Sequence, residues 1–127
     1  MAATDERDVV LREFFLGFVR LHVLYHAGHA PVCGVGLMAE MAHHGYRLTP
    51  GTLYPLLHRL ERAGFLTHQD RNVGGRRRRY YSRTERGAAV LAEAARRLPE
   101  LVGEVLGGAR AGSVGEHPAT GAGARIP

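Results

Sequence analysis

Residues 48–61 read LTPGTLYPLLHRLE and carry the signals of a single amphipathic helix. Thr49 suits the N-cap, and Pro50 suits the first helical position, where a missing N–H costs no hydrogen bond. Leu53, Leu56, Leu57 and Leu60 follow the i, i+3, i+4, i+7 spacing of a buried stripe. Gly64 supplies a C-terminal stop. The pattern predicts a helix over residues 50–63, in which Pro55 is an exception because it lacks a hydrogen-bonding N–H.

The hydrophobic period changes after this helix. Residues 65–69 and 78–83 have the pattern of strands, and the segment 72–75 ends in two glycines that suit a turn. We therefore expect a β-hairpin directly after the leucine-striped helix.

Two more helices are predicted upstream. Asp5 or Thr4 can cap a helix over about residues 6–27, and a shorter one follows over 35–43, with Gly45 at its C-terminal end. The first helix is apolar around most of its circumference, so it needs cover on more than one side. A domain of this size buries a limited share of its surface, which favours a second subunit as part of that cover.

The C-terminal part begins with Thr84, which can cap a helix over residues 85–106. Pro99 should kink or divide this helix. Residues 107–127 are rich in glycine, alanine and proline and lack apolar bulk, so we expect a disordered tail after a domain that spans 1–106.

Charge is concentrated in one short segment. The 127 residues carry a net charge of +5, and all 17 basic residues are arginine. Residues 70–86 hold seven arginines and two acids, whereas the segments on either side are each neutral. Concentrated positive potential attracts polyanions. The excess charge therefore lies on the predicted hairpin and its end.

The order of helix, helix, capped helix, basic hairpin and helix predicts a winged helix-turn-helix. This fold is mainly α with a small β-hairpin. The second helix of its helix-turn-helix can lie in a DNA major groove. We expect residues 50–63 to be the recognition helix and residues 71–79 to be the wing. The segments 6–27 and 85–106 are the expected dimerisation helices.

The same residues resemble the PadR family of bacterial transcriptional regulators. The resemblance rests on residues 48–61, on Gly64-Phe65-Leu66, on GGRRRRYY at 74–81 and on Thr84-Glu85-Arg86-Gly87, and it covers about residues 19–95. It implies a dimeric winged-helix repressor whose last helix packs on the N-terminal helix of the partner. The single C-terminal helix resembles the compact subfamily.

The chain departs from the family pattern at three points. Arg77 stands where the family often has proline, which makes the wing more basic and more flexible, and Arg83 stands where an apolar residue is usual. Compact members can bind hydrophobic drugs through tryptophans at the dimer centre, and this chain has no tryptophan.

The expected partner is double-stranded DNA with a pseudo-palindromic operator. Small residues at the start of the recognition helix would let backbone N–H groups approach phosphate, its middle would meet base edges, and its end and the wing would contact the phosphate backbone. The predicted DNA-binding residues are Thr49, Pro50, Gly51, Thr52, Tyr54, Pro55, His58, Arg59, Arg62, Arg76, Arg77 and Arg78. The predicted homodimer contacts are Phe14, Phe15, Phe18, Leu21, Leu98, Leu101, Val102 and Val105.

Other kinds of site have weak support. His22 and His26 have metal-compatible i, i+4 spacing and His29 follows, but no carboxylate or cysteine shares their register, so we expect no metal and no cofactor. Cys33 is interpreted as a small buried side chain rather than a sensor. No catalytic constellation stands out, so an enzyme is not expected. The polar, acidic N-terminus is unlike a signal peptide and no apolar stretch suits a membrane span, so we expect a cytoplasmic protein.

Two alternative functions stay open at this stage. A winged helix can bind a protein through its recognition surface, in which case replacing the wing arginines would leave partner binding intact. A small-molecule or metal sensor acting through the dimer interface would show a ligand-dependent shift in melting temperature. The effector that would release the expected repressor is not identified by the sequence.

Overall fold

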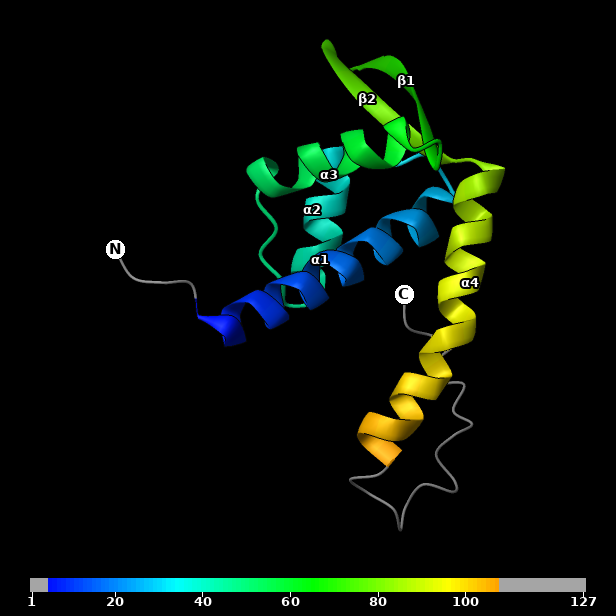
Figure 1. The fold of residues 1–127 in the computed structure, drawn as a ribbon. Coiled ribbons are helices and arrows are strands. Elements are labelled where there is room, and N and C mark those ends of the chain that lie inside the picture. The colour runs from blue at the N-terminus through cyan, green and yellow to red at the C-terminus, as the bar shows by residue number, and fades with distance from the viewer. Residues whose placement is uncertain (1–4, 108–127) are drawn as a thin grey trace. The chain divides into compact units, whose positions relative to one another are not determined.

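The computed structural model describes residues 5–107. The chain divides into two compact units, Met1–Ala88 and a second that begins at Ala89. The first unit holds three helices, a hairpin and the first residues of a fourth helix, and Figure 1 draws these elements as a ribbon. The predicted disordered tail lies almost entirely outside the described residues. None of the helices described within 5–107 is both long enough and apolar enough to cross a bilayer.

The first two helices follow the prediction closely. Helix α1 spans Glu6–Ala27, and the Asp5 side chain accepts a hydrogen bond from the Arg7 N–H at 3.1 Å, which makes Asp5 the cap. Helix α2 spans Gly34–His43 and ends before Gly45, whose φ of +87° suits glycine. Between them, Val32 forms a short antiparallel bridge with Tyr81 of the hairpin.

Helix α3 spans Pro50–Arg62 and contains Pro55 as expected. Its four-leucine stripe is buried against the other helices, with relative exposures of 6% or less. The stripe is part of the buried core of the first unit, to which α1, α2, the segment before α3 and the hairpin also contribute. The other buried apolar residues are Val19, Val23, Leu24, Ala27, Leu37, Met41, Leu48, Leu66 and Tyr81.

The hairpin is longer than predicted. Strands β1 (Leu66–Val73) and β2 (Arg76–Arg83) pair antiparallel, and the connection is the two-residue turn Gly74–Gly75, both at positive φ. The predicted strands, 65–69 and 78–83, are shorter than the observed ones. The reason is that the polar and charged residues near the turn lack the apolar alternation by which a half-buried strand is identified. Backbone pairing continues there because a Gly-Gly turn matches the twist of the two strands. Figure 1 shows the hairpin projecting beyond α3.

The final helix corrects one prediction. Helix α4 spans Glu85–Val102 and continues through Pro99 without a break, so Pro99 does not divide it. The regular helix ends before Gly103, and Gly103–Gly107 forms a π-helical turn instead of the predicted continuation to 106. Glycine has a low helix propensity, which explains the change at Gly103 better than the proline does.

Candidate nucleic-acid interface

The start of α3 leaves the Gly51 backbone N–H without an acceptor among the described residues. Thr49 occupies the N-cap position, but its side chain makes no capping hydrogen bond and its hydroxyl instead lies 3.4 Å from that of Thr52. The predicted capping bond is therefore absent. Thr49, Pro50 and Gly51 are exposed, and space around Gly51 is open. The Thr52 N–H is bonded to the Thr49 carbonyl at 3.1 Å, so the donor that this exposed helix N-terminus offers to a phosphate is the Gly51 N–H.

The face of α3 opposite the leucine stripe presents most of the predicted residues. Pro55, His58, Arg59 and Arg62 are exposed, and Thr52 is half-buried. Tyr54 differs, because its ring leans on α2. A Cβ added to Gly34 would lie 2.7 Å from Tyr54 Cε1 and closer still to the hydroxyl. The ring is 37% exposed, so one part packs within the domain and another part faces outward.

The hairpin sorts its arginines onto two faces. The register pairs Asp70 with Arg79 and Arg71 with Arg78, and side chains alternate between faces along a strand. Arg77 and Arg79 therefore share a face with Asp70, whereas Arg76 and Arg78 lie on the other face with Arg71.

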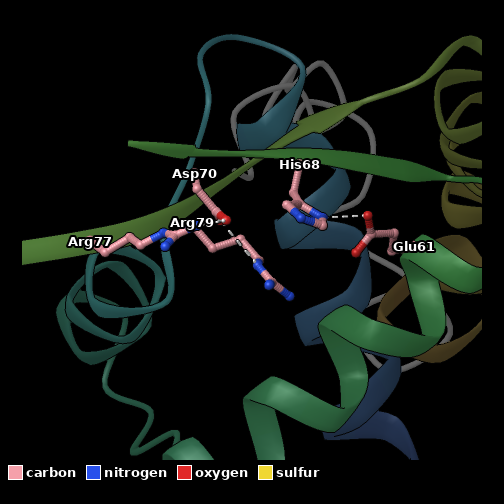
Figure 2. A network of polar contacts seen from close by, with 5 residues as sticks. All are labelled: Glu61, His68, Asp70, Arg77 and Arg79. Carbon is pink, nitrogen blue, oxygen red and sulfur yellow. Dashed lines mark hydrogen bonds and ion pairs between the residues drawn. The ribbon is translucent and has the colours of Figure 1, made fainter. Parts of the chain in front are cut away.

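Most of these arginines have partners within the chain. Asp70 lies 3.3 Å from Arg77 Nη2 and 3.4 Å from Arg79 Nε, and the guanidinium of Arg71 stacks 4.9 Å from the Tyr80 ring centroid. Figure 2 shows the two arginines converging on Asp70. Within residues 5–107, Arg76 and Arg78 have no hydrogen-bond or ion-pair partner. Their charges are therefore unpaired inside the chain.

The hairpin is tied to α3 through a second polar contact. His68 Nδ1 of β1 contacts a carboxylate oxygen of Glu61 on α3, and both side chains are less than one-third exposed (Figure 2). His68 lies on the same face as Asp70 and packs near Tyr81, with ring centroids 5.9 Å apart. The face of the wing that carries Arg77 and Arg79 is thus the face connected to α3.

Arg83 places a charge at the base of the wing, and a hydrogen bond to α1 accommodates it. Its Nη1 donates to the carbonyl of Leu24 at 3.2 Å, near the C-terminal end of α1. Terminal carbonyls of a helix lack intrahelical donors, so a guanidinium is well placed there. A Cβ added to Gly28 would lie 2.6 Å from Arg83 Nη2, so this packing depends on glycine at position 28.

Two of the histidines lie beside a carboxylate, one at i, i+4 spacing from it and the other on a different helix. Glu40 of α2 lies 3.7 Å from His26 Nε2 and 3.3 Å from His44 Nε2. His22 is buried and hydrogen-bonds the Phe18 carbonyl, and His29 lies beyond the end of α1 as expected. Burial lowers the pKa of His22, with His44 and His26 acting in the same direction. No group of three or more metal-ligating side chains with suitable geometry occurs among the described residues.

Two other predictions have different outcomes. Cys33 is half-buried rather than buried, because it lies at the N-cap of α2, where the chain enters the helix. Several predicted dimer residues present exposed apolar surface within the described chain: Phe14 is 62% exposed, Leu101 52% and Val105 59%. Phe15 and Phe18 instead pack against Tyr46, with ring centroids 5.2 and 5.0 Å away.

Sequence reasoning missed two residues of this surface. In the sequence, Arg79 belongs to the basic run without a predicted role in the site, and Asp70 is one of the two acids of that segment. The signal that could have found them is the Gly74–Gly75 pair. A two-residue turn at these glycines fixes Asp70 opposite Arg79.

Comparisons with known proteins agree with this architecture. Residues 23–93 match the sequence profile of the transcriptional regulator PadR-like family. The transcriptional regulator Rv3488 of Mycobacterium tuberculosis is 53% identical over 98 residues, which cover 77% of this chain and 92% of that protein.

Solved structures agree in fold. A PadR family regulator from Eggerthella lenta superposes with a TM-score of 0.62 at 31% identity, covering 80% of this chain and 96% of the other. A PadR-like transcription factor from Bacteroides fragilis gives a TM-score of 0.66 at 25% identity, covering 76% and 94%.

Proposed function

Because the chain belongs to the PadR-like family of transcriptional regulators, we propose that it binds double-stranded DNA sequence-specifically. It acts as a homodimeric repressor that an effector releases from a pseudo-palindromic operator. The observation that carries this proposal is the combination of a solvent-facing recognition helix with a directly connected hairpin that holds the chain's excess positive charge.

Helix α3 supplies the sequence-reading part of the proposed interface. Its uncapped first turn, with Thr49, Pro50, Gly51 and Thr52, would hold a phosphate and set the register. Tyr54, Pro55 and His58 would face base edges or thymine methyl groups in the major groove. Arg59 and Arg62, nearer the C-terminal end, would contact phosphates.

The wing supplies most of the electrostatic part. Arg76 and Arg78, which lack partners within the described chain, can bind phosphate without giving up an internal contact. Arg77 can also reach DNA but must first leave Asp70. Each arginine that neutralises a phosphate releases counterions and makes binding more sensitive to salt.

The proposed dimer places two recognition helices on one duplex. The exposed apolar residues of α1 and α4 are the expected contacts, and half-site centres would lie about one helical turn apart, roughly 34–36 Å. Analytical ultracentrifugation of the full chain at micromolar concentration tests this part. A monomer would overturn the dimeric arrangement, while the assignment of α3 and the wing would still be testable.

The wing assignment is tested by fluorescence anisotropy on labelled duplex DNA at several salt concentrations. In the Arg76→Ala/Arg78→Ala variant, the slope of log affinity against log salt should fall by about 0.9 for each lost phosphate contact. The Arg96→Ala/Arg97→Ala variant removes the same charge from α4 and is the matched control. If both variants behave alike, the wing has no special role and a protein partner becomes the better explanation for the recognition surface.

A further inference from the structure

Asp70 is an acidic residue in the middle of a surface that otherwise favours polyanions. The paired strands 66–73 and 76–83 carry six arginines, and Asp70 is their only acid. A carboxylate at such a place opposes the approach of phosphate, so it costs general affinity for DNA. The residues that contact Asp70 indicate its role.

The carboxylate holds two guanidinium groups from the opposite strand. One oxygen faces Arg79 Nε and the other faces Arg77 Nη2, as Figure 2 shows. Desolvation acts to raise the pKa of Asp70, but hydrogen bonds from Arg79 and Arg77 outweigh it and the pKa lies below its ordinary value. Asp70 is thus a charged partner for both arginines at neutral pH. Carboxylate and phosphate oxygens accept the same kind of charge-assisted hydrogen bond from a guanidinium, so Asp70 and a phosphate would compete for these two arginines.

The location of this cluster relates it to α3. The face of the hairpin that carries Asp70, Arg77 and Arg79 also carries His68, which contacts Glu61 of α3. The arginines on the opposite face, Arg76 and Arg78, have no such restraint among the described residues. The wing therefore combines two unrestrained arginines with two that a carboxylate restrains on the side connected to the recognition helix.

We propose that Asp70 is a positioning residue that increases discrimination between operator and other DNA. This inference rests on the proposed DNA-binding function. On a loosely bound duplex, Arg77 and Arg79 stay with Asp70 and contribute little. On a duplex seated by α3, phosphates come within reach of guanidinium groups that are already oriented, and the arginines exchange the carboxylate for phosphate.

The test compares two affinities for each variant of the full-length protein. One probe is a duplex selected from a random-sequence library by the wild-type protein, and the other is a scrambled duplex of the same composition. Asp70→Asn should raise affinity for the scrambled duplex by roughly three- to tenfold. Affinity for the selected duplex should rise less or fall, so the ratio of the two affinities should decrease at least threefold.

Two further variants separate positioning from charge. Asp8→Asn makes the same charge change at another exposed Asp–Arg pair, in which Asp8 lies 3.2 Å from Arg7, and should leave the ratio unchanged. Asp70→Glu keeps the carboxylate and should keep most of the wild-type ratio. Circular dichroism verifies that each variant is folded, and Asp70→Glu still tests the proposal if Asp70→Asn is not.

Each outcome has a distinct meaning. An unchanged ratio in Asp70→Asn, with both affinities raised equally or not at all, overturns the proposal because Asp70 would then act only as a charge or not at all. Equal loss of discrimination in Asp70→Glu and Asp70→Asn also overturns it. If the wild-type protein selects no duplex, the proposed function itself fails, which distinguishes that result from failure of this inference.

Discussion

Gly87 is the position where one added methyl group should most clearly disturb the base of the wing. It lies buried in the first turn of α4, against the chain that links α3 to β1. A Cβ there would lie 2.9 Å from Arg83 Cγ, 3.1 Å from the Phe65 carbonyl carbon and closer still to the Phe65 oxygen. Phe65 can move only with the backbone, and its oxygen accepts the Thr84 N–H at 3.1 Å.

The expected cost of Gly87→Ala follows from these contacts. Alanine in a helix is intrinsically favoured over glycine by about 1 kcal/mol. Overpacking against backbone costs about 1–3 kcal/mol, and weakening the Thr84–Phe65 hydrogen bond costs about 0.5–1.5 kcal/mol. The unfolding free energy should therefore fall by roughly 1–3 kcal/mol, which lowers the melting temperature by roughly 5–20 °C for a domain of this size.

Thermal unfolding followed by circular dichroism measures this effect. Gly36→Ala is the matched control, because a Cβ there, in the first turn of α2, would meet only Cys33 Sγ at 3.7 Å, which is an ordinary contact. That variant should be as stable as wild type or more stable by up to about 1 kcal/mol. If Gly87→Ala melts at or above the wild-type temperature, the described packing at the base of the wing is wrong.

Three further predictions concern the core, the base of the wing and pH. Leu57→Ala removes a fully buried side chain and should cost about 2–5 kcal/mol in urea denaturation, whereas the exposed Arg62→Ala should change little. Gly28→Ala should displace the Arg83 guanidinium from the Leu24 carbonyl and cost about 1–2 kcal/mol in the same assay, and an unchanged midpoint would refute that contact. Burial lowers the pKa of His22 below its ordinary 6.5, so on acidification the unfolded chain takes up this proton first and stability should fall as the pH drops through about 6.5. His22→Asn can keep the hydrogen bond to the Phe18 carbonyl, and its melting temperature should depend less steeply on pH between about 5 and about 7.5 than that of wild type; equal slopes would exclude His22 as the cause.

Local signals in the sequence were sufficient for the helical part of the fold. The leucine spacing, Pro50 at the first helical position and Gly64 after the helix predict α3 almost to the residue, because burial and helix-end signals act within one turn. Thr49 occupies the N-cap position but makes no capping hydrogen bond. The sequence predicts the wing, but it does not predict the register in which its two strands pair. Placing the turn at 72–75, rather than at Gly74–Gly75, hides the pairing of Asp70 with Arg79, and a register shift of one residue exchanges the two faces of a strand.

Contacts between distant segments could not be predicted from periodicity. Glu40 approaches His26 only because α2 packs beside α1, whereas His44 lies four positions after Glu40 at the end of the same helix. The Arg83–Leu24 bond joins residues 59 positions apart. The sequence makes Tyr54 a candidate base-reading residue and leaves packing within the domain open, and the structure shows that its ring rests on Gly34. These features follow from tertiary packing, which a one-dimensional pattern does not contain. The dimer contacts and the DNA-binding residues remain predictions, because they involve a second subunit and a DNA duplex.

Sequence-specific DNA binding is the central claim, and competition fluorescence anisotropy measures it most directly. Labelled DNA from upstream of the protein's own gene is titrated with the full chain, and an unlabelled scrambled duplex is added as competitor. We expect tight binding that an excess of the scrambled duplex does not displace and that weakens steeply with salt. Weak binding that the scrambled duplex abolishes equally well, together with no enriched sequence from a random library, would contradict the claim.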